Sequence, residues 1–265
     1  MGFYDAWNAE AHIRLFDLWS RVPLFVLKDR YRRFNEVQLL NAVADGLTLP
    51  FTLLEVGCAT GEFYRYFTVR YPKASYIGCD ISEVAISRAQ KKYRAARFLR
   101  TDTNLDAVAD LKPDIVFCRD VILHQTAPFA FLQRLYDLAQ HFLILRLRTR
   151  DVGTTESDPE KSCQFMYGAW VPYIVLNCGE LVGEIIQFVP SPRRVHLSKH
   201  YMVLGGQHAR FLPKECYYQR TGTAESALLI EKGDGSSTCA VHEEARPEDL
   251  HLRPMARVVA WLARR

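Results

Sequence analysis

A glycine-bearing turn, and an acidic residue 23 positions beyond its first glycine, are the features of this sequence best suited to hold a ligand. The turn contains Gly57 and Gly61 and follows an apolar run closed by Glu55, as expected where a buried parallel strand brings its carboxyl end to a binding site. Only a residue without a β-carbon lets the backbone turn sharply and approach a bound molecule closely. Asp80 closes the next strand-like run, and one carboxylate there can accept hydrogen bonds from both hydroxyls of a ribose.

The same turn distinguishes between two classes of cofactor. A dinucleotide-binding turn has the spacing G-x-G-x-x-G, and Glu62 stands where its third glycine would be. The Glu62 carboxylate would face a pyrophosphate, whereas S-adenosylmethionine carries a sulfonium and an amino group but no phosphate. The turn therefore favours S-adenosylmethionine, and a dinucleotide-dependent oxidoreductase is the least favoured function.

Residues 55–61, EVGCATG, resemble the first motif of the class I, seven-strand S-adenosylmethionine-dependent methyltransferases, E/D-x-G-x-G-x-G. The chain departs from this motif once, because Ala59 stands at the middle glycine and its methyl group narrows the turn. The resemblance covers residues 51–148, and residues 193–232 by topology alone. It implies an α/β fold with a doubly wound, mostly parallel seven-strand sheet that ends in an antiparallel hairpin.

The resemblance also implies a cofactor site at the ends of successive strands. Asp80 would bind the ribose, because Ser82 can cap the helix that follows. An acidic residue after the third strand, here Asp102, would bind the adenine amino group, although Asp102 could equally cap the short helix after it. The expected cofactor residues are Glu55, Gly57, Ala59, Gly61, Asp80, Ile81, Asp102, Thr103 and Arg119.

The end of the fourth expected strand, residues 113–120, bears on the class of acceptor. Family members that methylate amide or base nitrogens typically carry Asn/Asp-Pro-Pro-Tyr here, and cytosine-carbon enzymes carry a Pro-Cys pair. This chain has Cys-Arg-Asp-Val at residues 118–121, so a small-molecule acceptor is favoured over nucleic acid.

His124 is the candidate general base. It follows Asp120 by four residues, so both side chains share one face if the segment is helical. With an ordinary pKa of about 6.5, it would take a proton from a hydroxyl or amine, and turnover would rise with pH as the imidazole loses its proton. The more frequent alternative is a structural histidine that binds a backbone carbonyl or lines the adenine.

Residues 149–192 depart from the core pattern and are expected to form a substrate-binding insertion. Tyr167 and Trp170 belong to an aromatic segment that would line a pocket, although aromatic clusters more often fill a core. Arg146, Arg148 and Arg150 recur with period two and so share one face of the fifth strand. Arg146 is expected to pair internally, whereas Arg148 and Arg150 predict an acceptor that carries an acidic group.

The rest of the chain is expected to complete one α/β unit. Residues 1–50 would form an N-terminal helical cap with helices over 3–20 and 28–45, residues 51–232 the cofactor domain, and residues 233–265 a linker and helix. In the resembled family such N-terminal helices often cap the cofactor, although Tyr4 and Trp7 could instead pack at the sheet edge.

Composition limits where the protein is expected to reside and which partners it is expected to bind. The net charge is only +4, no apolar run approaches the length of a bilayer span, and the N-terminus lacks the apolar stretch of a signal peptide. Seven cysteines without a C-x-x-C pair favour reduced thiols over disulfides or a zinc site. We therefore expect a cytoplasmic protein without a metal and with no nucleic-acid or membrane partner; the sequence leaves the oligomeric state open, with a homodimer as one option.

Two functions from different classes stay open at this point. One is a methyltransferase that acts on an oxygen or nitrogen of a small molecule. The other is a non-catalytic S-adenosylmethionine-binding or regulatory module of the same fold. Intact Gly57, Gly61 and Asp80 argue against decay of the cofactor site but do not prove chemistry.

Overall fold

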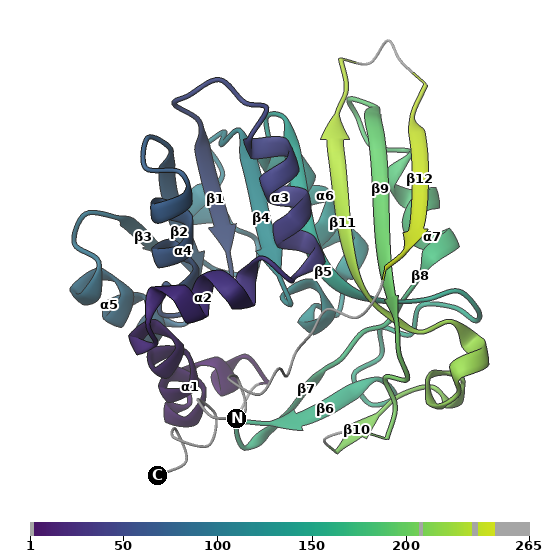
Figure 1. The fold of residues 1–265 in the computed structure, drawn as a ribbon. Helices are drawn as coiled ribbons and strands as arrows, with labels where there is room; N and C mark the ends of the chain where they lie inside the picture. The colour runs from purple at the N-terminus through teal and green to yellow at the C-terminus, as the bar shows by residue number, and fades with distance from the viewer. Residues whose placement is uncertain (1–2, 207–208, 235–237, 247–265) are drawn as a thin grey trace.

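The computed structural model describes residues 3–206, 209–234 and 238–246, and is centred on a nine-stranded sheet (Figure 1). Its strands are β1 (Thr52–Val56), β2 (Ser75–Asp80), β3 (Arg97–Arg100), β4 (Ile115–Arg119), β5 (Phe142–Arg150), β8 (Leu176–Asn177), β9 (Pro192–Tyr201), β11 (Ala224–Lys232) and β12 (Ala240–Ala245). Their order is β12-β9-β11-β5-β4-β1-β2-β3, with β8 paired to β5. The first five strands are parallel and β11 runs antiparallel between β5 and β9, which confirms the doubly wound sheet with a terminal hairpin.

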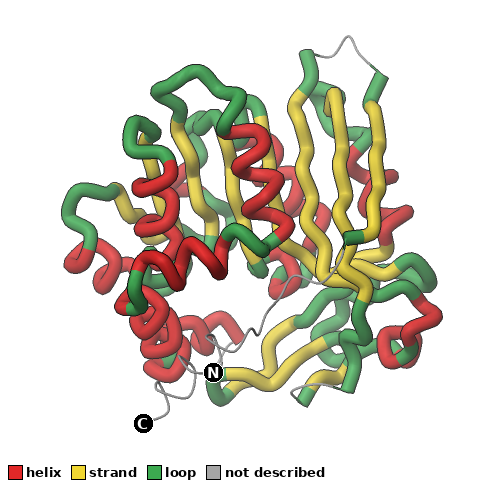
Figure 2. Tube along the Cα trace, in the orientation of Figure 1, coloured by secondary structure: helices red, strands yellow, loops and turns green. Residues whose placement is uncertain are grey.

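Helices cover both faces of the sheet (Figure 2). One apolar core includes side chains of α2 (Leu24–Tyr31), α3 (Asn35–Ala44), α4 (Glu62–Arg70) and α5 (Glu83–Lys92). The other includes side chains of α6 (Pro128–Leu138) and α7 (Cys178–Ile185). Because β1 and β4 are buried between the two cores, both strands are almost continuously apolar, as parallel strands covered on both faces must be.

The N-terminal cap is helical as expected but is more broken than the sequence pattern suggested. A 3₁₀ helix, η1 (Phe3–Asn8), precedes α1 (Glu10–Arg21), and the second expected helix is split into α2 and α3. Pro23 is the N-cap of α2, so this helix begins before the predicted start at residue 28. The chain then turns at residues 32–34, where α2 ends and Phe34 becomes the extended N-cap of α3.

The expected insertion forms a second, three-stranded sheet of β6 (Cys163–Met166), β7 (Ala169–Pro172) and β10 (Arg210–Phe211). β6 and β7 are joined through Tyr167 and Gly168, which both have positive φ, 53° and 85°. Two such central residues suit the twist of a tight hairpin. This small sheet lies beyond the carboxyl ends of the parallel strands, across from η1 and α1 (Figure 1).

The C-terminal part differs from the sequence expectation at one strand. Residues 240–245 were expected to belong to a polar linker but form β12, which extends the main sheet in parallel with β9. Its residues are mostly exposed, so no apolar alternation marks it in the sequence. The predicted helix at residues 254–265 lies outside the described residues. The remaining short helices are η2 (Asp106–Val108), η3 (Ile122–His124), η4 (Lys214–Tyr217) and η5 (Gln219–Thr221).

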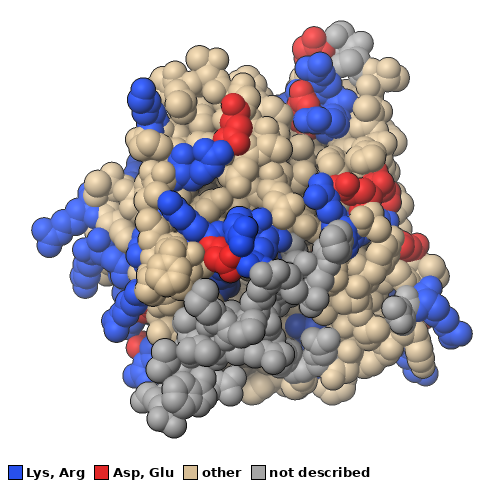
Figure 3. Space-filling model, in the orientation of Figure 1, with Lys and Arg blue, Asp and Glu red and all other residues tan. Residues whose placement is uncertain are grey.

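Two surface properties complete the description. None of the helices within the described ranges has both the length and the apolar character needed to cross a bilayer. On the face drawn in Figure 3, lysines and arginines are scattered over several elements with acidic side chains among them.

Candidate active site

A cavity of about 270 Å³ opens at the carboxyl ends of the parallel strands. Its wall includes residues from the ends of β1, β2 and β4, from the N-terminal helices and from the β6–β7 hairpin. Most of the expected cofactor residues line it: Glu55, Gly57, Ala59, Asp80, Ile81, Asp102, Thr103 and Arg119. The sheet thus brings together side chains that are separated along the sequence.

The turn after β1 requires glycine for two separate reasons. Gly57 has φ 79°, and a β-carbon at this position would collide with the side chain of Val121. Gly61 has φ 78°, and its β-carbon would lie 2.8 Å from Phe98. Gly61 does not line the cavity but is the N-cap of α4, so its role is to start that helix. Ala59 also has positive φ, 45°, which costs a residue with a β-carbon roughly 1 kcal/mol.

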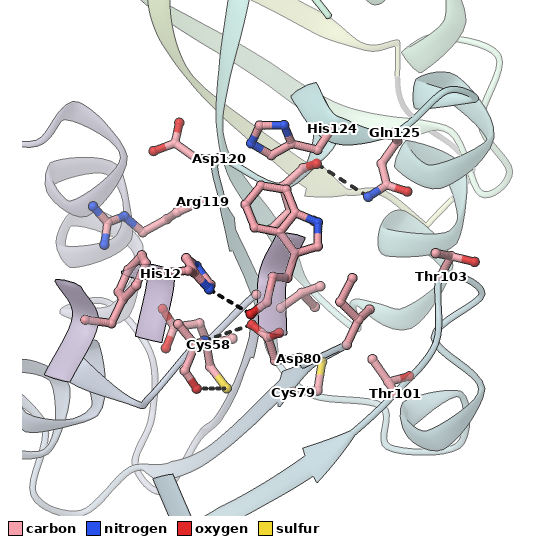
Figure 4. A pocket seen from close by; sticks show the side chains of 18 of the residues that line it. His12, Cys58, Cys79, Asp80, Thr101, Thr103, Arg119, Asp120, His124 and Gln125 are labelled. Atoms are coloured by element: carbon pink, nitrogen blue, oxygen red, sulfur yellow. Dashed lines mark hydrogen bonds between the residues drawn. The ribbon is translucent and has the colours of Figure 1, made fainter. Parts of the chain in front are cut away.

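Asp80 fixes the turn from the end of β2. Its Oδ2 accepts the backbone N–H of Ala59 at 2.9 Å, and its Oδ1 accepts that of Ser82 at 2.8 Å. Burial raises the pKa of Asp80 above its ordinary value, against the effect of these two donors. Each carboxylate oxygen has further acceptor capacity, and Asp80 lies in the cavity between Thr101 and Arg119 (Figure 4). Ser82 caps α5 as expected, because its hydroxyl accepts the N–H of Ala85 at 3.2 Å.

The wall beyond β3 contains two predicted residues, Asp102 and Thr103, and one that the sequence reasoning missed, Thr101. Asp102 Oδ1 accepts the N–H groups of Asn104 and Asp106 at 3.0 and 3.1 Å. Asp102 therefore caps the following turn, which was the alternative to adenine binding, and it also lines the cavity. Thr101 precedes it, and its buried hydroxyl oxygen has no hydrogen-bond partner within the part of the chain that the structure describes. Its position at the end of β3 was the available signal.

Two further ionisable residues line the cavity, Glu55 of β1 and Arg30 of α2. Burial raises the pKa of Glu55 to about 8, and the Tyr76 hydroxyl donates to its carboxyl group. The guanidinium carbon of Arg30 lies 3.6 Å from the centre of the Trp19 ring. Arg30 Nε is buried without a hydrogen-bond partner, and among the described residues no carboxylate lies within ion-pair distance of it. The sequence reasoning missed Arg30 because it lies in an ordinary helical pattern.

A network of three arginines and three carboxylates lies beside the cavity. Arg146 of β5 is central, with Nη2 2.5 Å from Glu225 Oε2 on β11 and Nη1 3.5 Å from Glu36 Oε1 on α3. Arg119 donates from Nε to the same Glu36 oxygen at 2.9 Å. Glu36 is fully buried, so its charge is compensated by the two guanidinium groups instead of by water.

This network corrects the expectation that Arg148 and Arg150 bind an acidic group of the acceptor. Arg148 is buried and pairs with Asp120 at 2.8 Å and with Glu225 at 3.0 Å. Arg150 is also buried, with Nη1 3.9 Å from a carboxylate oxygen of Glu215. Neither arginine lines the cavity. Carboxylates from distant parts of the chain neutralise this face of β5, as was expected for Arg146 alone.

His124 lies in a single 3₁₀ turn, η3, so the shared helical face predicted for Asp120 and His124 is absent. Asp120 has φ 55° and directs its carboxylate to Arg148, whereas His124 Nδ1 lies 2.7 Å from the carbonyl oxygen of Pro172. Because a carbonyl only accepts, Nδ1 must donate and Nε2 keeps its lone pair. Burial lowers the pKa of His124 to about 4, so the ring is neutral at neutral pH.

Aromatic rings from distant segments meet beside His124. The Trp7 ring lies 4.6 Å from the imidazole, and the His12 ring lies 4.8 Å from that of Tyr167 at the hairpin tip. All four line the cavity, so Tyr167 is placed where it was expected. Trp170 is not: it is 45% exposed and packs against Phe165 and Phe211. Its strand neighbour Val171 is fully buried, as expected because neighbouring residues of a strand face opposite sides.

The sequence around this cavity is similar to that of known proteins. Residues 54–141 match the family model of a methyltransferase domain. An uncharacterized protein of Rickettsia prowazekii (strain Madrid E) is 33% identical over 75 residues, which cover 26% of this chain and 14% of that protein's length.

Solved structures resemble the fold over a larger part of the chain. Magnesium protoporphyrin IX methyltransferase of Synechocystis PCC 6803, with bound SAM, aligns at a TM-score of 0.52 and 16% identity, covering 86% of this chain and 94% of that one. The plantazolicin methyltransferase BpumL, in complex with SAH, aligns at a TM-score of 0.51 and 16% identity, covering 87% and 94%. Phosphoethanolamine N-methyltransferase 2 of Haemonchus contortus, in complex with S-adenosyl-L-methionine, aligns at 0.54 and 12% identity, covering 74% and 51%.

The buried network generates a stability prediction. Glu36→Gln should lower the free energy of unfolding by about 3 kcal/mol, because Arg146 and Arg119 would lose a buried compensating charge. Urea denaturation measures the change. As a control, Asp45→Asn removes a pair with Arg70 in which the side chains are 49% and 45% exposed, and the loss should be much smaller. Equal effects of the two substitutions would show that the network does not stabilise the fold.

Proposed function

We propose that the protein transfers a methyl group to an oxygen or nitrogen of a small molecule, from the premise that residues 54–141 match a methyltransferase domain. The observation that carries the proposal is the coincidence of a glycine turn, the Asp80 carboxylate and a neutral imidazole in one cavity. When bound, S-adenosylmethionine supplies a methyl group on a positively charged sulfur. The residues of the cavity then have to bind this cofactor, orient the acceptor and take up a proton.

The wall of the cavity fits S-adenosylmethionine. The absent β-carbon of Gly57 keeps the turn open, and Asp80 has acceptor capacity for the ribose hydroxyls. The unpartnered hydroxyl of Thr101 can bind a polar atom of the nucleoside. Arg30 also lines the cavity, and its guanidinium group, which has no carboxylate partner among the described residues, can bind the carboxylate of the methionine portion.

His124 is the group that can remove the acceptor proton. Pro172 holds its proton on Nδ1, so Nε2 is the basic atom; burial keeps the ring unprotonated at neutral pH but also makes Nε2 a weak base, so it suits an acceptor that loses its proton only as the methyl group transfers. A hydroxyl or amine that donates to Nε2 would pass its proton there as the methyl group transfers. The aromatic side chains of Trp7, His12 and Tyr167 favour an acceptor with an apolar or planar part.

Calorimetric titration of the full chain with S-adenosylmethionine, S-adenosylhomocysteine and NAD tests the cofactor. Binding of the first two and not of NAD is expected, and failure to bind either sulfur compound would overturn the proposal. Turnover is tested by incubating the protein with methyl-labelled S-adenosylmethionine and a small-molecule metabolite extract. Label on an extracted compound supports the enzyme, whereas tight binding without transfer would favour a regulatory module.

Asp80→Ala should weaken binding of S-adenosylhomocysteine by about ten- to a hundredfold. Two ribose hydroxyls would lose a charged acceptor, and a hydrogen bond to a charged group contributes about 1.5–3 kcal/mol. Calorimetry measures the change, and Asp106→Ala, which removes a nearby carboxylate outside the cavity wall, should leave affinity unaltered. Unchanged affinity in a folded Asp80→Ala protein would refute the assignment.

Arg30→Gln should weaken binding of S-adenosylmethionine by roughly tenfold or more, because the methionine carboxylate would lose a charged donor. Binding of 5′-methylthioadenosine, which lacks that carboxylate, should not change. The matched control is Arg32→Gln: Arg32 is 65% exposed and already paired with Asp29 at 2.6 Å. An equal loss for both ligands in Arg30→Gln would mean that Arg30 shapes the wall and does not bind the carboxylate.

The pH dependence of His124 follows from its lowered pKa. The imidazole should stay neutral, with its proton on Nδ1, from pH 8 down to about 5, and should gain a second proton only near pH 4. Turnover should therefore not rise through pH 6.5, in contrast to an exposed histidine. Nitrogen-15 NMR of labelled histidine measures both properties, and His124→Asn identifies the signal while keeping a donor to Pro172. Titration of that signal around pH 6.5 would contradict the buried, neutral base.

A further inference from the structure

Two histidines and a glutamate gather on the outer edge of the main sheet, far along the strand order from the cavity. His196 lies on β9, and His242 and Glu244 lie on β12, the edge strand. One ligand atom of each residue can be chosen so that all three atoms lie within 4.8 Å of one another. The cysteines alone predict no metal site, and His196 lies far along the sequence from His242 and Glu244, so no ligand spacing marks the cluster.

The parallel ladder explains why these side chains share one face. His242 is the direct partner of His196, so their side chains project side by side, with ring centres 4.8 Å apart. Glu244 follows His242 by two residues and therefore projects on the same side. Its Oε1 already lies 3.0 Å from His196 Nε2. Donors around a tetrahedral zinc ion lie about 3.3 Å apart, as follows from bond lengths of about 2.0–2.1 Å, so small side-chain rotations would suffice.

We propose that His196, His242 and Glu244 form a binding site for a divalent transition metal of the zinc class. Two imidazole nitrogens and one carboxylate oxygen suit zinc, whereas calcium and magnesium prefer sites made of oxygen ligands alone. Three protein ligands leave the fourth position of the metal to water.

The surroundings of the cluster permit such a site and suggest what it does. Arg246 Nε contacts Glu244 at 2.7 Å, but this bond and the bond to His196 both use Oε1. Ser198, the ladder partner of Glu244, has a buried hydroxyl without a hydrogen-bond partner. A metal here would join β12 to β9 by ligand bonds in addition to the ladder.

The test uses the full chain, stripped with a chelator and titrated with zinc sulfate in the absence of S-adenosylmethionine. We expect one equivalent to bind and to raise the melting temperature. His242→Gln should weaken binding at least tenfold and abolish the melting shift. His200→Gln, a matched change of another β9 histidine outside the cluster, should alter neither. The melting temperature of each metal-free variant shows whether it folds.

Cobalt(II) distinguishes this site from the free cysteines. Cobalt bound by imidazole and carboxylate groups lacks the thiolate-to-metal charge-transfer absorption that a cysteine site shows. Stoichiometric binding without that absorption, lost in His242→Gln and kept in His200→Gln, supports the site. Absence of stoichiometric binding, a thiolate band, or equal binding by both variants would overturn the proposal. None of these readouts depends on methyl transfer, so their failure would leave the proposed function untouched.

Discussion

The positions of the cavity walls depend on the buried ion pairs around Arg146. This arginine is only 3% exposed, and desolvation of its charge is costly unless carboxylates compensate it. Glu36 comes from the N-terminal helices and Glu225 from the terminal hairpin, so one guanidinium group joins three separate parts of the chain. Arg119 and Asp120 take part in the same network and also line the cavity. The requirement for charge neutrality therefore fixes where the N-terminal cap sits relative to the ends of the strands.

Much of the fold could be predicted from local patterns, because the parallel strands are buried on both faces and therefore read as apolar runs with carboxylates or glycines at their ends. The terminal hairpin was expected from the topology of the resembled family, since β9 mixes buried residues with charged ones and is not an apolar run. β12 could not be predicted, since its exposed residues at 240–245 carry no alternation and its pairing partner β9 lies some 40 residues away in the sequence. The division of the second N-terminal helix into α2 and α3 also escaped, because apolar spacing continues across the break.

The residues of the cavity also fall into two groups: those that a short segment of sequence identifies, and those that only the folded chain identifies. Gly57, Ala59 and Asp80 follow from short segments of sequence, because a turn and the strand end beside it determine their roles. Arg148 was misassigned because Glu225, which neutralises it, is supplied by a strand formed much later in the chain. Arg30 was missed for the converse reason: it becomes distinctive only because the folded chain gives it no carboxylate partner among the described residues. Pairing of charges is a property of the tertiary structure that residue spacing alone does not encode.

If His124 is the base, its hydrogen bond to Pro172 would connect proton removal with the choice of acceptor. Pro172 ends β7, and the hairpin that contains β7 also presents Tyr167 to the cavity. If His124 is the base, an acceptor too large for the cavity would push the hairpin outward, free Nδ1 and let the imidazole change tautomer or turn. Such a molecule would still bind but would face a misdirected base. Discrimination between acceptors would then appear in kcat more than in KM, because the wrong acceptor would bind without being aligned with the base.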